Sequence, residues 1–165
     1  MNTNTNASSI PIVSGIREQA KTSDAWLVDV WGVLHIGAVA FAAAADACVK
    51  FREAGGYVVL LTNAPRPGPA VVRQIARIGV PQTAYDAVLS SGDVTRGLVT
   101  EWRDKQIHHL GPDRDRGIFE NIDIKYATSI EADIVVVTGL LDDETETPDD
   151  YATTLKSLQR RNIAM

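Results

Sequence analysis

Two polar segments that each follow an apolar run are the residues of this sequence best suited to chemistry. Asp29 follows the run Trp26-Leu27-Val28, and the pair Thr62-Asn63 follows Val58-Val59-Leu60-Leu61. A carboxylate can act as a nucleophile, and neutral hydroxyl and amide donors beside it can bind a phosphoryl group. The set predicts phosphoryl transfer through an aspartyl-phosphate. Taken alone, an Asp shortly before Gly32 is equally typical of a turn or a helix cap.

The elements that must position these side chains are parallel strands separated by helices. Apolar runs without a polar face are typical of strands in a parallel sheet that helices cover on both sides. We expect such strands around Asp29, over 57–61 and over 87–90, with helices over 42–54 and 68–79 between them. This order gives a right-handed doubly wound unit. Its ligands bind beyond the carboxyl ends of the strands, so we expect Asp29 and Thr62 side by side there.

The motifs in this order resemble the haloacid dehalogenase superfamily. The motifs are Asp29-Val30-Trp31-Gly32-Val33-Leu34, Leu60-Leu61-Thr62-Asn63 and Leu89-Ser90-Ser91-Gly92-Asp93. Within the superfamily, the chain is similar to the class IIA branch, which includes sugar-phosphate, pyridoxal-phosphate and p-nitrophenyl-phosphate phosphatases. The resemblance implies an α/β fold, with a three-layer Rossmann-like core around a parallel sheet and then an α/β cap that covers the active site. We expect a disordered tail over 1–10, the N-terminal half of the core over 11–91 and a partial cap over 92–165.

The resemblance also assigns roles to residues. It implies that Asp29 attacks a small phosphate monoester, with Mg²⁺ held by the Asp29 carboxylate and the backbone carbonyl of Trp31. Thr62 and Asn63 would donate hydrogen bonds to the phosphoryl oxygens. Arg66 directly follows this strand end and could reach a phosphate, but a solvated loop residue is an equally good interpretation of it.

The first motif departs from the family pattern at Trp31. The family has a second Asp there, which protonates the leaving group and later activates water, and an indole cannot exchange a proton in that role. A subgroup of the branch carries the same Asp-x-Trp-Gly-Val-Leu-His version, and this sequence is most similar to it. His35 of that motif could contact a ligand, although a lone histidine is more often a packed or hydrated side chain.

The sequence also lacks the later motifs of the family. A lysine that offsets phosphate charge and the remaining acidic Mg²⁺ ligands follow the cap in the family, and these 165 residues hold no counterpart. We therefore expect the N-terminal portion of a longer protein, weak or inactive as a phosphatase by itself. The alternative is a non-catalytic scaffold that binds a phosphorylated ligand or a protein partner. The strand of Asp29 would be an unpaired edge, which predicts self-association or binding of the missing C-terminal half.

Composition restricts the partners further. A net charge of -5 argues against nucleic acid or an anionic membrane as the main partner, because both need a basic surface. The polar segment 1–9 does not fit a signal peptide or a membrane anchor. One cysteine cannot form an internal disulfide, so we expect a cytoplasmic protein. The resemblance implies that its partner is a small phosphorylated metabolite.

Helical spacing predicts where three further side chains point. Cys48 shares the spacing of the apolar residues in the helix over 42–54, so we expect it in the core. Arg73 and Arg77 lie one turn apart on the opposite side from Val71 and Ile75, so we expect them in solvent.

Overall fold

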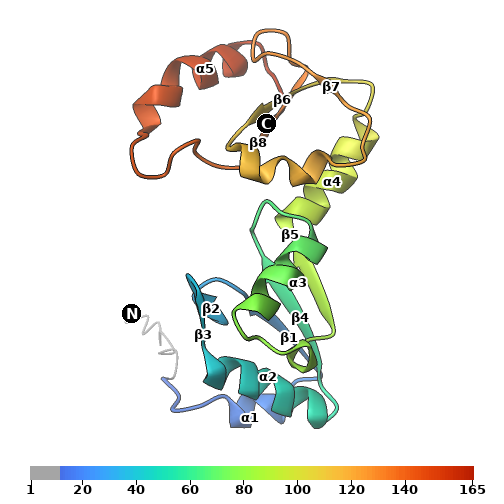
Figure 1. Cartoon of the computed structure of the whole chain (residues 1–165), viewed down its shortest axis with the longest axis vertical. Coiled ribbons are helices and arrows are strands. Elements are labelled where there is room, and N and C mark those ends of the chain that lie inside the picture. Colours follow the sequence, from blue (N-terminus) through green and yellow to red (C-terminus); the bar gives the residue numbers. More distant parts are fainter. Residues whose placement is uncertain (1–11) are drawn as a thin grey trace, which may run out of the picture.

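The computed structural model describes residues 12–165, which form two α/β units joined by helix α4 (Figure 1). Each unit contains a parallel three-stranded sheet, so the predicted α/β class with parallel strands is confirmed. The predicted tail over 1–10 lies outside the described residues. None of the helices within 12–165 combines the length and apolar character needed to cross a membrane.

The first unit is built on a sheet with the strand order β1-β4-β5, all parallel. Its elements are α1 (Arg17–Ala20), β1 (Ala25–Asp29), β2 (His35–Ile36), β3 (Val39–Ala40), α2 (Ala42–Glu53), β4 (Tyr57–Thr62), α3 (Gly68–Arg77), the short 3-10 helix η1 (Gln82–Ala84) and β5 (Ala87–Ser90). The register pairs Asp29 with Leu61 and Thr62 with Ser90, which brings the carboxyl ends of the three strands to one edge.

Helices α2 and α3 cover one face of this sheet. Their buried residues recur at three- and four-residue spacing, as in Cys48 and Phe51 of α2 and in Val71 and Ile75 of α3. The Phe51 ring stacks on Trp26 of β1, with 3.9 Å between the ring centroids. Burial raises the pKa of the Cys48 thiol, which confirms that this side chain faces the core.

The opposite face of the sheet is uncovered by the described residues. Leu27 on β1 is 74% exposed, and Leu61 and Leu89 on the next two strands are more than 40% exposed. The prediction that helices cover both faces is therefore not met within residues 12–165. β1 also lies at the edge of the sheet, because its only described partner is β4.

Two elements of the first unit, β1 and α1, are short. The apolar run continues past Asp29, but β1 ends there because the chain turns at Gly32, where a φ of 80° suits glycine. The Gly32 amide donates to the His35 carbonyl at 2.8 Å, which closes this turn. Helix α1 is limited to four residues, Arg17–Ala20, because Ile16 before it is 48% exposed and finds no core to pack against.

The second unit follows β5 without a break. Its elements are α4 (Ser91–Glu101), β6 (Gln106–Leu110), the 3-10 helix η2 (Asp113–Phe119), β7 (Lys125–Tyr126), β8 (Ile134–Val137) and α5 (Pro148–Arg160). The parallel sheet has the order β7-β6-β8. Val99 of α4 packs with Ile107 and Ile118, and Leu158 of α5 packs on the other side of the sheet with Val135.

Candidate active site

The carboxyl ends of the first sheet form an open cavity of about 780 Å³. Its polar lining comes from the ends of all three strands, and its apolar wall comes from the uncovered sheet face and α4. The lining residues are Leu27, Asp29, Trp31, Leu61, Thr62, Asn63, Leu89, Ser90, Ser91, Val94 and Thr95. The structure thus brings together four of the five predicted site residues, Asp29, Trp31, Thr62 and Asn63. The fifth, Arg66, does not line this cavity.

Among residues 12–165, Asp29 is the only charged residue that lines this cavity. It is the last residue of β1, and one carboxylate oxygen, Oδ1, accepts a hydrogen bond from the Val30 amide at 2.8 Å. This bond fixes the orientation of the carboxylate, while the side chain stays exposed to the cavity. An oriented, exposed carboxylate has the geometry that a nucleophile requires.

Trp31 lies on the turn that follows β1, and His35 begins β2 just after it. The indole is 59% exposed and meets the His35 ring edge to face, with 5.3 Å between the centroids. His35 itself is buried, and its Nδ1 lies 3.1 Å from the Gly37 carbonyl, to which it donates. His35 lines a smaller cavity of about 200 Å³ that shares Trp31, Thr62 and Asn63 with the first. It is a packed side chain that also borders the candidate site.

Thr62 and Asn63 supply neutral hydrogen-bonding groups at the end of β4. The Thr62 hydroxyl oxygen accepts a hydrogen bond from the Ala64 amide at 3.2 Å, so its proton remains available to a ligand. Thr62 is buried, whereas Asn63 is exposed in the cavity. Because β1 and β4 are adjacent, parallel and in register at Asp29 and Leu61, Thr62 lies one residue beyond the level of Asp29.

Asp93 organises the loop behind these residues, and sequence reasoning gave it no role. Its Oδ1 accepts from the Gly68 amide at the start of α3 at 2.9 Å. It also forms a capping box with Ser90 at the start of α4. The Ser90 hydroxyl donates to the Arg66 carbonyl at 2.6 Å, which ties the loop after Asn63 to the same point. A Ser followed three residues later by an acid is the sequence signal that reveals such a cap.

Arg66 does not line the cavity of Asp29. Its Nη1 donates to Gln74 Oε1 at 3.4 Å, and its Nε lies 3.9 Å from the Asp115 carboxylate on η2. The guanidinium is therefore directed toward α3 and the second unit. A contact between Arg66 and a phosphate beside Asp29 stays a prediction, and it requires the side chain to leave these partners.

The site supplies only part of a Mg²⁺ coordination shell. Mg²⁺ takes six oxygen ligands, of which one or two are usually protein carboxylates. Within residues 12–165 no group of three or more His, Cys, Asp or Glu side chains could hold a metal ion. The Asp29 carboxylate and the Trp31 carbonyl suit the chemistry of such an ion, and other ligands must complete the shell.

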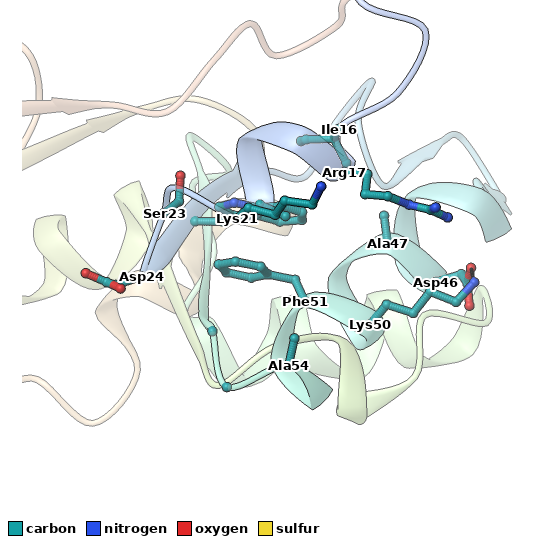
Figure 2. A pocket seen from close by; sticks show the side chains of 14 residues that line it. Ile16, Arg17, Lys21, Ser23, Asp24, Asp46, Ala47, Lys50, Phe51 and Ala54 are labelled. Carbon is teal, nitrogen blue, oxygen red and sulfur yellow. Dashed lines mark hydrogen bonds and ion pairs between the residues drawn. The ribbon is translucent and has the colours of Figure 1, made fainter.

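A second cavity of about 590 Å³ lies at the opposite end of β1, between α1 and α2 (Figure 2). The Phe51 ring lies against it, and charged side chains surround it. Three of these charged side chains, those of Lys21, Asp46 and Lys50, are already in ion pairs, Lys21 with Glu18 and Lys50 with Asp46. The cavity lies at the amino ends of the strands, away from Asp29 and Thr62, so it is not the candidate active site.

Comparison with known proteins places these features in a family. The model of the family "haloacid dehalogenase-like hydrolase" matches residues 26–125. The structure of a haloacid dehalogenase-like family hydrolase from Brucella suis is 42% identical with a TM-score of 0.83, over 93% of this chain and 58% of that chain. The chain thus spans little more than half the length of this relative. A search of curated proteins found no match.

More distant structures share the fold. A 4-nitrophenylphosphatase from Thermotoga maritima is 20% identical with a TM-score of 0.59, over 86% of this chain and 53% of that chain. A glycerol phosphate phosphatase from Mycobacterium tuberculosis, solved in complex with magnesium, is 18% identical with a TM-score of 0.58, over 86% of this chain and 43% of that chain. At these identities the likeness concerns the fold alone.

Proposed function

The chain belongs to the haloacid dehalogenase-like hydrolases. On this basis we propose that it is a member of their class IIA branch and carries the nucleophile and phosphate-binding groups of a phosphatase for small phosphate monoesters. The observation that carries the proposal is the shared cavity of Asp29, Thr62 and Asn63. Phosphoryl transfer requires a carboxylate nucleophile and neutral hydrogen-bond donors around the same phosphoryl group, and adjacent parallel strands supply both here. We also propose a cytoplasmic location, because the single Cys48 forms no internal disulfide.

The proposed reaction has two displacements at phosphorus. The Asp29 carboxylate attacks in line, the bond from phosphorus to the ester oxygen breaks, and an alcohol leaves with a proton from solvent. Water then attacks the aspartyl-phosphate, which releases inorganic phosphate and restores Asp29. Thr62 and Asn63 donate hydrogen bonds to the phosphoryl oxygens in both steps, which stabilises the charge that spreads over them.

Mg²⁺ fits this proposal as a cofactor held by Asp29 and the Trp31 carbonyl. When bound, it would supply the positive charge that offsets the phosphate, a charge that no Lys or Arg lining this cavity provides. The remaining ligands must come from outside the described residues.

Trp31 favours a second candidate function. Because its indole carries no exchangeable acid, the leaving group and the attacking water receive no general acid-base help, which typically contributes about 10²–10⁴-fold. A scaffold that binds a phosphorylated ligand or a protein partner without turnover needs the same donors and no such group. This second candidate retains Thr62 and Asn63 as ligands and gives Asp29 no covalent role.

The two candidates differ in whether Asp29 bonds to a phosphoryl group. Beryllofluoride with Mg²⁺ mimics a phosphorylated carboxylate, so we expect it to shift the amide signals of Asp29, Thr62 and Asn63 in a proton–nitrogen correlation spectrum of the chain. Asp29→Asn should abolish the shifts, because an amide cannot form this adduct. Asp104→Asn, at an exposed carboxylate of the second unit, should leave them unchanged.

The opposite result would contradict the nucleophilic role. If beryllofluoride shifts no signal at this edge of the sheet even in a form of the protein that also carries the later metal ligands of the family, or shifts the same signals in Asp29→Asn, Asp29 is not the phosphoryl acceptor. Shifts caused by inorganic phosphate at Thr62 and Asn63 that persist in Asp29→Asn would then favour the non-catalytic scaffold.

A further inference from the structure

Three arginines converge on a cavity that is separate from the Asp29 site. The cavity has a volume of about 330 Å³ and is formed by α3 and the loop before it. Its lining residues are Arg66, Ala70, Arg73, Gln74, Arg77 and Ile78. From Ala70 onward they recur at three- and four-residue spacing, so they occupy one face of α3, and Arg66 adds a guanidinium from the preceding loop.

The positive charge of this cavity is poorly compensated. Arg66 has Asp115 at 3.9 Å, near the limit of an ion pair. Within residues 12–165 no acidic side chain lies within 4 Å of a charged nitrogen of Arg73 or Arg77. Like charges one helical turn apart repel each other. The cluster is unusual in a chain whose acidic residues outnumber Lys and Arg by 21 to 16.

The surroundings hold Arg66 in place for a ligand. Gln74 accepts from its Nη1 at 3.4 Å, and the Asp115 side chain on the other side is only 5% exposed. The hydrogen bond to Gln74 restricts Arg66, and a restricted side chain loses less freedom on binding than a solvated one. Ala70 and Ile78 add an apolar boundary, and the volume lies near the lower end of the range for small-molecule sites.

We propose that Arg66, Arg73 and Arg77 bind the phosphate group of a small molecule in this cavity on α3. A guanidinium presents paired N–H donors that match the oxygens of a phosphate, and a doubly charged anion between three arginines relieves their repulsion. The site differs in kind from the Asp29 cavity, which contains neutral donors, one carboxylate and no arginine. Its chemistry is that of binding without turnover, because no nucleophile lines it.

Calorimetric titration of the full chain tests the proposal, with inorganic phosphate and phenyl phosphate at low ionic strength as probes. We expect Arg73→Gln/Arg77→Gln to weaken binding by about tenfold or more, because each charge-assisted hydrogen bond contributes strongly. Asp115→Asn should strengthen it, because this carboxylate competes with the anion for Arg66. Arg103→Gln, at an exposed arginine of the second unit, shows how far the loss of one positive charge outside the cavity weakens binding.

A third variant separates this site from the proposed active site. Thr62→Val removes a donor of the Asp29 cavity, so binding to the arginines should persist in it. Binding lost in Thr62→Val but kept in Arg73→Gln/Arg77→Gln would overturn the inference and leave the proposed function intact. Equal weakening by Arg103→Gln, or no heat of binding from either probe, would also overturn it. Circular dichroism of each variant identifies any that fail to fold.

Discussion

Trp31 decides how far the chemistry at Asp29 can proceed. It stands two residues after the carboxylate, lines the same cavity and exposes 59% of its surface there. A carboxylate at this position would reach the same space. Substituting the indole by an acid therefore adds the missing proton donor without moving the nucleophile.

The first prediction concerns this substitution. We expect no appreciable Mg²⁺-dependent hydrolysis of p-nitrophenyl phosphate by the chain itself, because its cavity holds one carboxylate and no cation. In a form of the protein that also carries the later lysine and acidic ligands of the family, we expect weak activity. Trp31→Asp should raise its rate by up to about 10²–10⁴-fold.

Trp31→Phe is the matched control, because it changes the ring and adds no acid. A rise in rate as large as that of Trp31→Asp would mean that bulk, and not the missing proton donor, limits turnover. Robust hydrolysis by the unaltered chain, abolished by Asp29→Ala, would contradict the first part of the prediction.

The placement of most site residues could be predicted because each follows an apolar run. Asp29 ends one strand and Thr62 ends the next, and parallel strands bring such ends together. Arg66 was not predictable in the same way. Its direction depends on Gln74 and on Asp115, which is 49 residues further along the chain, and no local pattern encodes that contact.

At the scale of elements, Asp86 joins the end of α2 to the start of β4. Its Oδ2 accepts from Arg52 Nε at 2.9 Å and from the Val58 amide at 2.8 Å. The hydrogen bond from Arg52, and then the one from Val58, lower the pKa of Asp86. Folding therefore favours the ionised form of this carboxyl group.

The second prediction follows from this direction. A lowered pKa in the folded state stabilises the fold at pH above the ordinary pKa of an aspartate, and the contribution is lost as the pH falls through the folded pKa. Asp86→Asn should therefore lower the free energy of unfolding at neutral pH, and its difference from the parent should shrink at acidic pH. Urea unfolding at a series of pH values measures this difference.

Asp46→Asn is the control, because its ion pair with Lys50 is exposed and contributes little. A difference between Asp86→Asn and the parent that stays constant down to the lowest pH would show that ionisation of Asp86 does not stabilise the fold.

The third prediction concerns the close contact between α4 and the loop before α3. A Cβ atom on Gly92 would lie 2.5 Å from backbone atoms of Arg66, so the two segments could not approach as they do. We expect Gly92→Ala to lower the free energy of unfolding by about 1–3 kcal/mol. Denaturant unfolding followed by circular dichroism measures the change.

Gly97 on the same helix provides a matched control. A Cβ atom there meets no atom within 4 Å, and alanine favours a helix interior over glycine by about 0.5–1 kcal/mol. Gly97→Ala should therefore stabilise the chain. Equal effects of the two substitutions would mean that helix propensity, and not the contact with Arg66, governs Gly92.

Element positions followed from periodicity where a core was available. The predicted helices over 42–54 and 68–79 correspond to α2 and α3, and the strand predicted over 87–90 is β5. The failure has one physical cause. Leu27 belongs to an apolar run that was expected to be covered on both sides, but the described residues offer no surface to cover it. A pattern shows that a face is apolar, and it does not show what packs against it.

At the scale of the whole molecule, the uncovered sheet face is the feature with the largest physical consequence. It continues from Leu27 through Leu61 and Leu89 to Val94 on α4, and the edge of β1 beside it has no described partner. Exposed apolar faces and unpaired edges favour association with other polypeptides.

The fourth prediction is that the chain, produced alone, self-associates or aggregates at micromolar concentration unless another polypeptide covers this face. Size-exclusion chromatography with light scattering measures the molar mass. Leu27→Lys should shift the population toward monomer, because a charge on this face and edge opposes pairing. Val39→Lys, at an apolar residue of β3 that is 65% exposed, should have less effect. A stable monomer of the unaltered chain would contradict the prediction.

Helix α4 begins at the capping box of Ser90 and Asp93 and connects the two units (Figure 1). Its first residues line the wall of the Asp29 cavity, and Arg96 further along donates hydrogen bonds to the carbonyls of Gly117 and Ile118 on η2. Eleven residues give the helix a length of about 16 Å. A movement of its far end by an ångström would tilt the helix, and with it the wall of the Asp29 cavity, by only a few degrees.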